Sequence, residues 1–130
     1  MIGDRWVFLI LREAFFGVRR YDALRRNTGA SPTVLADRLK RLVAGSVFER
    51  VRYGEHKTRY EYRLTKKGRD LYPIIVMLLA WGDRWEAGED GPPLLLVHEP
   101  CGSRLDPRVT CTACGEGVTA RDVRWAPSKA

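Results

Sequence analysis

The sequence predicts an α+β fold that is mainly α, with one small antiparallel hairpin. Apolar residues recur at helical spacing over residues 4–45, and the pattern then changes to strand-like alternation over residues 47–64. A long apolar helix is expected after the hairpin. The chain has 130 residues, of which 45% are hydrophobic, so it can form one small domain with a modest core and an appendage.

Three helices are expected in the first third of the chain. The first runs from Asp4, which is placed to cap it, to about Phe16, and the second covers residues 20–27. The third begins at Ser31, a favoured N-cap residue, and ends at Gly45. The second and third helices are joined by a short turn with a central glycine, which is the arrangement of a helix-turn-helix.

Two strands are expected next, because residues 47–53 and 59–64 alternate between apolar and polar side chains. The segment between them is polar, basic and turn-like. A β-hairpin directly after a helix-turn-helix is the arrangement called a winged helix-turn-helix.

A long helix is expected from Thr65, as its cap, to about Ala87. Pro73 should kink it near Asp70, because proline cannot donate a hydrogen bond to the preceding turn. The helix is apolar on more than one face, so we expect it to pack against a second copy of the chain. Packing only on its own domain and on the C-terminal segment is the alternative.

Charge is distributed unevenly along the chain. Residues 1–72 contain 17 basic and 8 acidic side chains, and residues 73–130 contain 6 and 8. Of the 23 basic residues, 18 are arginine, whose planar fork suits phosphates and base edges. The first half therefore has the excess of positive charge expected of a surface that binds a polyanion. A basic surface that is only solvated is the alternative.

Several function classes are disfavoured by what the sequence lacks. Its longest hydrophobic stretch, residues 74–81, is far shorter than a membrane span, and no secretory signal is recognisable. The chain has two histidines, no glycine-rich phosphate loop after a strand and no serine in a nucleophile elbow. A soluble cytoplasmic protein that is not an enzyme is expected.

Short motifs in a fixed order resemble the HxlR-type winged helix-turn-helix regulators. They lie at residues 2–6, 9–13, 19–24, 29–31, 35–39, 59–62, 64–68 and 81–82. The resemblance implies a prokaryotic, cytoplasmic transcription factor that is associated with the nucleoid through DNA. It also implies a homodimer that binds a palindromic double-stranded operator, responds to a small-molecule or redox effector and has no membrane partner.

The chain departs from this family pattern at two places. Family members usually carry a further N-terminal segment, often with a redox-sensing cysteine, whereas Met1 falls directly on the motif. Either the true start lies upstream or part of the usual dimer contact is missing. In the wing, Lys57 and Thr58 replace a Pro-Pro pair common in the family, which gives the tip more backbone freedom and an extra charge.

In this architecture the third helix lies in the major groove and the wing on the flanking minor groove. Because the leucines of this helix must point inward, the residues left for the groove are Thr33, Val34, Asp37, Arg38 and Arg41. Among them Arg38 is the expected guanine-contacting residue. Contacts to phosphates or to the minor groove are expected from Arg19, Arg20, Ser31, His56, Lys57 and Arg59.

The three cysteines all lie in the last thirty residues, as His98-x₂-Cys101-Gly and, after nine residues, Cys111-x₂-Cys114-Gly. This pattern resembles a zinc ribbon in which histidine replaces one cysteine, so one structural Zn²⁺ per chain is expected. A redox dithiol of Cys111 with Cys114, or three reduced thiols without a ligand, are the alternatives.

The predicted organisation is therefore a DNA-binding and dimerisation domain at residues 1–87, a linker at 88–93 and a Cys/His extension at 94–130. Strands at residues 94–97 and 118–123 are expected to flank the extension, forming a small β tail like a zinc ribbon. A zinc-ribbon interaction module or RNA-binding module of a macromolecular complex is the alternative function. Tyr60 and Tyr62 are the candidates for stacking on single strands, although both fit better as core and wing support.

Overall fold

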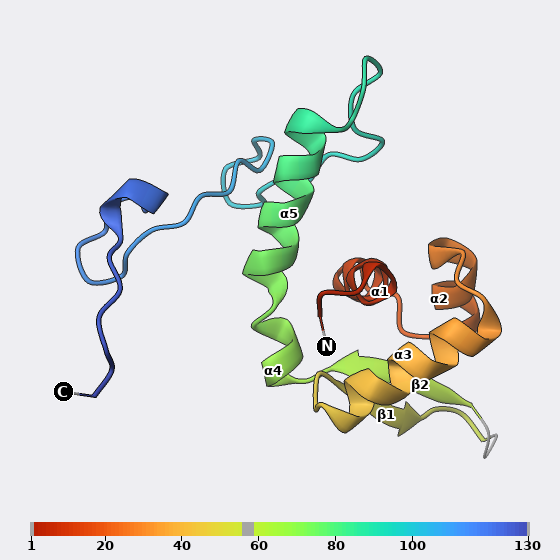
Figure 1. The fold of residues 1–130 in the computed structure, drawn as a ribbon. Coiled ribbons are helices and arrows are strands. Elements are labelled where there is room, and N and C mark those ends of the chain that lie inside the picture. Colours follow the sequence, from red (N-terminus) through yellow and green to blue (C-terminus); the bar gives the residue numbers. More distant parts are fainter. Residues whose placement is uncertain (1, 56–58, 130) are drawn as a thin grey trace. The chain divides into compact units, whose positions relative to one another are not determined.

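Three helices pack around one apolar core, as the sequence predicts (Figure 1). The computed structural model describes residues 2–55 and 59–129. Its first three helices are α1 (Arg5–Phe15), α2 (Tyr21–Thr28) and α3 (Pro32–Ala44). Their inward side chains are at most 1% exposed: Val7, Ile10, Leu11, Leu24, Leu35, Leu39 and Leu42.

The helix ends confirm the predicted caps. The Asp4 carboxylate accepts hydrogen bonds from the amides of Trp6 and Val7, and the Ser31 hydroxyl accepts one from the amide of Val34 at 3.2 Å. Each cap satisfies amides that have no partner inside the helix. Gly29 ends α2 with a φ of 73°, in the left-handed region that glycine adopts at low cost.

The wing is an antiparallel hairpin of β1 (Phe48–Arg52) and β2 (Tyr60–Leu64), with Phe48 opposite Leu64. The chain entering α2 lies along the other edge of β2, where a single bridge joins Arg20 to Glu61. Phe48 is buried, while Arg52 is exposed. The hairpin is thus held against the helices by its base.

The predicted kink is an interruption between two helices, α4 (Lys66–Arg69) and α5 (Tyr72–Trp85). Pro73 lies in the first turn of α5, where its missing amide leaves no hydrogen bond unmade. Thr65 caps α4 as expected, because its hydroxyl accepts from the amide of Gly68 at 3.1 Å.

The chain divides into two compact units, residues 1–76 and 77–130, with the division inside α5 and before the predicted boundary at residue 87. The prediction of strands at residues 94–97 and 118–123 is wrong. Val97 pairs only with Arg104 in a single bridge, and residues 120–122 form a short 3₁₀ helix, η1 (Ala120–Asp122). With one bridging partner, the segment at 94–97 has no ladder through which to extend.

Candidate nucleic-acid interface and cysteine tail

The exposed face of α3 is polar and basic. Thr33, Lys40 and Arg41 are exposed, whereas Val34 and Asp37 are half-buried. Arg41 pairs with Asp37 one turn earlier, with Nε 3.1 Å from Oδ2. Four of the five residues assigned to the groove therefore lie at or beside this face, and it offers two cationic side chains.

Lys40 belongs to this face but was not among the sequence-based candidates. At about 100° per residue, Lys40 lies about 140° around the helix from Leu35, while Arg38 lies only about 60° from it. Placing the residues on a helical wheel around the buried leucines would have identified Lys40.

Arg38 is held against α1 instead of pointing freely into solvent. Its Nε donates to Oδ2 of Asp4 at 2.9 Å, its Nη1 donates to Oδ2 of Asp37 at 2.7 Å, and its side chain is only 20% exposed. The expected contact of Arg38 with guanine stays a prediction, with which these contacts inside the chain compete. The position beside the buried stripe brings its guanidinium to the cap of α1, where it joins α3 to α1.

The contacts of Asp4 and Arg38 favour their charged forms. Burial raises the pKa of Asp4, but hydrogen bonds from the amides of Trp6 and Val7 and from Arg38 outweigh it, so the pKa lies below its ordinary value. The hydrogen bond to Asp4, followed by the one to Asp37, raises the pKa of Arg38.

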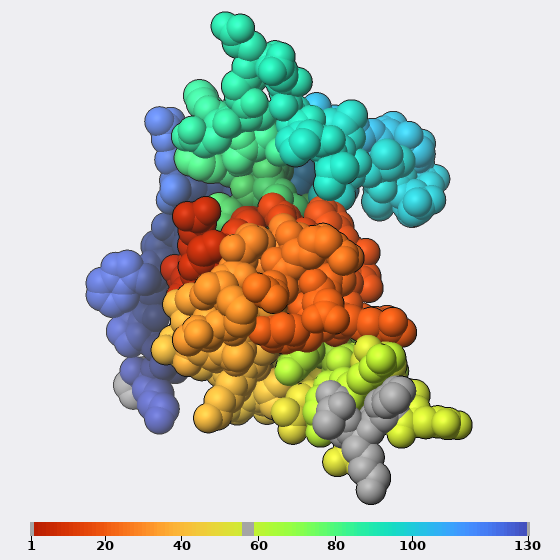
Figure 2. Space-filling model, turned by 90° about the vertical axis from the view of Figure 1, so that its right-hand side faces the viewer, coloured from red at the N-terminus to blue at the C-terminus, as the bar shows by residue number. Residues whose placement is uncertain are grey.

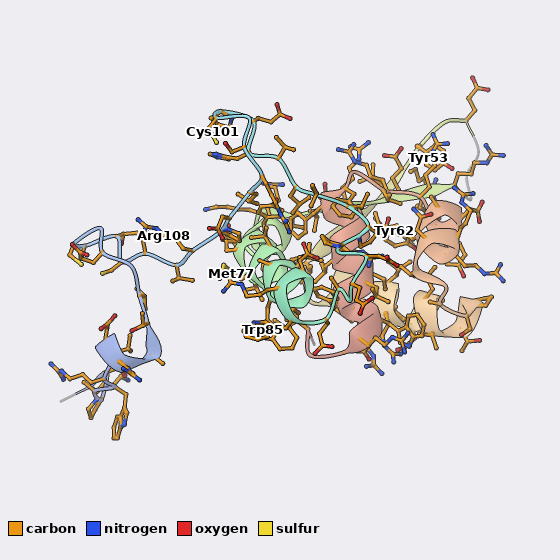
Figure 3. All side chains as sticks on the ribbon, turned by 90° about the horizontal axis from the view of Figure 1, so that it is seen from above. Tyr53, Tyr62, Met77, Trp85, Cys101 and Arg108 are labelled. Atoms are coloured by element: carbon orange, nitrogen blue, oxygen red, sulfur yellow. The ribbon has the colours of Figure 1, made fainter. Side chains whose placement is uncertain are left out.

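A hollow of about 600 Å³ lies between α2 and the wing. Figure 2 shows this side of the molecule, with the orange helical region above the yellow-green wing. It is lined by Arg20, Tyr21, Asp22, Ala23, Arg26, Tyr53, Arg59, Tyr60 and Tyr62. The guanidinium of Arg20 lies over the ring of Tyr53, 4.4 Å from its centroid, and Figure 3 shows Tyr53 and Tyr62 on this part of the molecule. A polar hollow lined by three arginines suits an anionic backbone.

The wing carries basic residues along β1 as well as near its tip. Arg50 and Arg52 lie 4.2 and 5.9 Å from the ring centroid of Tyr60, and both are exposed. Among the predicted wing residues, Arg59 is exposed immediately before β2, whereas His56 and Lys57 lie outside the described residues. Arg50 and Arg52 were not predicted as contacts, because only the residues at and next to the basic tip of the hairpin were expected to reach DNA.

The other predicted backbone contacts are accessible. Arg19, Arg20 and Ser31 are exposed, and the carbonyl of Arg19 accepts from the amide of Tyr62 at 2.8 Å. The main-chain pairing fixes the direction in which the Arg19 and Arg20 side chains leave the sheet edge.

The tail places the four predicted metal ligands as two separate pairs. Nδ1 of His98 lies 3.4 Å from Sγ of Cys101, and the amide of Ser103, followed by His98, lowers the pKa of Cys101. Hydrogen bonds from the amides of Cys114 and Ala113 lower the pKa of Cys111. Within residues 2–55 and 59–129, no cluster of three or more Cys, His, Asp or Glu is close enough to share a metal ion.

The comparison that decides the family covers the helices and the wing together. The profile of the HxlR-like helix-turn-helix proteins matches residues 1–90. The chain belongs to the HxlR-like helix-turn-helix family. An uncharacterized HTH-type transcriptional regulator of Mycobacterium tuberculosis is 50% identical to this HxlR-like chain, over 98% of the chain and 80% of the relative.

Solved structures agree with this assignment. PA1607, a proposed transcription factor, matches with a TM-score of 0.84 and 34% identity over 96% of this HxlR-like chain and 87% of its own. The redox regulator HypR, in its oxidized form, matches with a TM-score of 0.60 and 28% identity, over 64% of this chain and 87% of its own. The match to PA1607 thus includes most of the cysteine tail.

This HxlR-like protein is a DNA-binding transcriptional regulator, as its family and the names of its relatives indicate. Those names describe regulators of transcription and not enzymes. In the described part of the chain, no helix combines the length and the apolar character needed to cross a membrane.

Proposed function

We propose that this HxlR-like regulator binds a two-fold symmetric duplex operator as a homodimer, with α3 in the major groove and the wing on the flanking minor groove. The observation that carries the proposal is the exposed, basic face of α3 formed by Thr33, Lys40 and Arg41. An α-helix fits the major groove, and its exposed side chains can then reach base edges. The excess of basic residues within residues 1–72 supplies attraction to phosphates.

Different residues have different roles in this proposal. Lys40 and Arg41 contact base edges together with Thr33, Val34 and Asp37, while Arg38 positions α3. Arg19, Arg20 and Ser31 contact phosphates at the start of α2 and α3. The wing contributes Arg50, Arg52, His56, Lys57 and Arg59.

The second copy of the chain is proposed to pack on α5. Ile74, Leu78, Trp81 and Trp85 are spaced by four, three and four residues, so they form one stripe along the helix. These four side chains are 51, 48, 55 and 67% exposed. Four large apolar side chains in one exposed stripe match the seam of a helix pair. A two-fold dimer would then present two α3 helices to two half-sites.

We also propose that an effector controls DNA binding by this regulator. Support for redox control comes from the similarity to HypR, which is itself a redox regulator. A prokaryotic regulator of this kind would act in the cytoplasm, at the nucleoid.

The test is a gel shift with the full-length protein on a duplex selected from a random pool, with single-stranded RNA as competitor. We expect the duplex to be retained against RNA, because the rings in the hairpin are occupied by other side chains. Tyr60 lies beside Arg50, and Tyr62 packs edge-on against Phe48 with their centroids 6.4 Å apart. Displacement by RNA at equal concentration would favour the RNA-binding alternative.

A double variant, Lys40→Ala with Arg41→Ala, tests the assignment of α3. We expect it to lose about 1–3 kcal/mol of operator-binding free energy per base contact while binding to random duplex falls much less. The control is Arg121→Ala, which removes an exposed charge from η1 in the tail. Equal losses on operator and random duplex would contradict base contact by α3.

A further inference from the structure

The cysteine tail contains a structural repeat of 13 residues. Val97 bridges Arg104 in the first hairpin, and Thr110 bridges Gly117 in the second, each 13 residues later. His98, Cys101 and Gly102 of the first hairpin correspond in the same way to Cys111, Cys114 and Gly115 of the second.

The backbone hydrogen bonds repeat with the same offset. The amide of His98 donates to the carbonyl of Ser103 at 2.9 Å, and that of Cys111 donates to Glu116 at 2.8 Å. Gly102 donates to His98 at 2.8 Å, and Gly115 donates to Cys111 at 2.6 Å. Both glycines have positive φ, 69° and 78°, so both turns need the left-handed conformation at the same position. Two hairpins of unlike sequence therefore adopt one backbone geometry.

In the first hairpin the two potential ligand atoms lie at a distance that suits one metal ion. Tetrahedral Zn²⁺, with Zn–S near 2.3 Å and Zn–N near 2.0–2.1 Å, separates a ligating sulfur and nitrogen by about 3.6 Å. Sγ of Cys101 and Nδ1 of His98 are 3.4 Å apart, which is close to that edge. In the second hairpin Cys111 and Cys114 have the same spacing, and the amide of Gly115 donates to the carbonyl of Cys111 at 2.6 Å as that of Gly102 does to His98.

We propose that the two hairpins together hold one Zn²⁺ ion per chain, through His98 and Cys101 of the first and Cys111 and Cys114 of the second. Each hairpin offers two ligands, and a closed tetrahedral site needs four. Three thiolates and one imidazole are ligands that suit zinc. Because the two pairs do not form one cluster among the described residues, this proposal requires the two hairpins to approach each other when the ion binds.

The segment between the hairpins allows both pairs of ligands in one chain to bind the same ion. Residues 105–109 join the hairpins, and five residues span up to about 17 Å when extended. Every residue from 112 to 129 is exposed, so the tail has no apolar core of its own to hold it. Val97, Val109 and Val118 are also exposed, at 56, 52 and 36%, and flank the two turns. Metal binding would hold the two hairpins together in place of an apolar core.

The experiment starts with the full-length protein, reduced and treated with a chelator, and titrates it with Co²⁺ followed by Zn²⁺. We expect one Co²⁺ per chain with thiolate charge-transfer absorption, displacement by one equivalent of Zn²⁺, and protection of three thiols from a thiol reagent. Three accessible thiols without bound metal would overturn the proposal. So would a Cys111–Cys114 disulfide that forms in the metal-loaded protein under air.

Substitutions distinguish the proposed metal ligands from the residues beside them. Cys111→Ser should lose the metal at stoichiometric concentration, and His98→Ala should weaken binding at least tenfold. His98→Cys should restore it, because the thiolate is an equivalent ligand. Thr112→Ala, between two ligands, is the matched control and should bind one ion. Full binding by Cys111→Ser would overturn the assignment.

A mixture tests whether one chain supplies all four ligands. Chains lacking the first pair, H98A with C101A, are co-expressed with chains lacking the second, C111A with C114A. A site within one chain predicts no retained zinc in the mixed preparation. Recovery of zinc there would show that the pairs come from different chains and would overturn the within-chain site.

Discussion

At the scale of single residues, Asp4 stabilises two elements with one carboxylate. Its Oδ1 caps α1, and its Oδ2 accepts from Arg38 of α3. Because both contacts favour the ionised form, the pKa of Asp4 is lowered in the folded protein. A carboxyl group with a lowered folded pKa contributes stability above its unfolded pKa, and this stability is lost as the pH falls through the folded pKa.

We therefore expect Asp4→Asn to be less stable than the wild-type protein at pH 7, because asparagine can still cap the helix but cannot pair with Arg38 as an anion. The difference should persist down to the unfolded pKa, near 3.9, and vanish at lower pH as Asp4 becomes protonated. Urea unfolding from about pH 7 to pH 2 measures it. A difference that stays constant over this range would show that the charge of Asp4 contributes nothing.

Gly68 has a steric role at the junction of β2 and α4. A Cβ at this position would overlap the carbonyl oxygen of Val47, which also accepts a hydrogen bond from the amide of Thr65 at 3.1 Å. This close contact explains why residue 68, three residues after the capping threonine, is a glycine.

Gly68→Ala should lower the free energy of unfolding by about 1–3 kcal/mol, because the new methyl group forces α4 away from Val47. Denaturant unfolding gives the value. Gly3→Ala is the control, since nothing lies within 4 Å of a Cβ there. Equal stability of the two variants would contradict the close contact.

At the scale of elements, α3 illustrates what can and what cannot be predicted from sequence. The inward leucines of α3, its caps and its ends follow from periodicity and local chemistry. The partner of Arg38 does not, because Asp4 is 34 residues away and the pair depends on how α1 packs on α3. The two strands were likewise predictable from alternation, whereas the bridge from Arg20 to Glu61 was not.

The different positions of Arg38 and Lys40 lead to different expected effects. Arg38→Ala should lower the Tm, because it removes the link between α3 and α1. Lys40→Ala should leave the Tm within about 2 °C, since exposed substitutions usually change stability little, and should weaken operator binding. Thermal unfolding and fluorescence anisotropy on one operator separate the two effects. An unchanged Tm for Arg38→Ala would contradict the role of Arg38 in joining α3 to α1.

For α5, the central prediction concerns its exposed stripe. Trp81→Glu places a charge in the middle of the proposed dimer seam, so we expect monomers in sedimentation analysis and at least a roughly tenfold loss of operator affinity, because the two half-sites no longer act together. Arg84→Ala is the control on the same helix, because Arg84 is exposed and outside the stripe. Retention of the dimer by Trp81→Glu would place the seam elsewhere.

At the scale of the whole molecule, charge and architecture divide in similar places. The excess of basic residues belongs to residues 1–72, and the first compact unit ends at residue 76. Fold class, wing and family were accessible from sequence because each depends on local periodicity and on motif order. The sequence could not show that the two segments expected as strands in the tail are not strands. Such a segment forms a strand only when a neighbour pairs with it along its length.

Selection of duplex sites from a random pool, followed by sequencing, shows whether two α3 helices recognise one operator. We expect an enriched motif with two-fold symmetry, with half-sites one helical turn apart, about 10 base pairs centre to centre, or a multiple of it. Lys40→Ala should change the preferred base at equivalent positions in both half-sites. Enrichment of no motif, or of an asymmetric motif that Lys40→Ala leaves unchanged, would contradict recognition of an operator by two α3 helices.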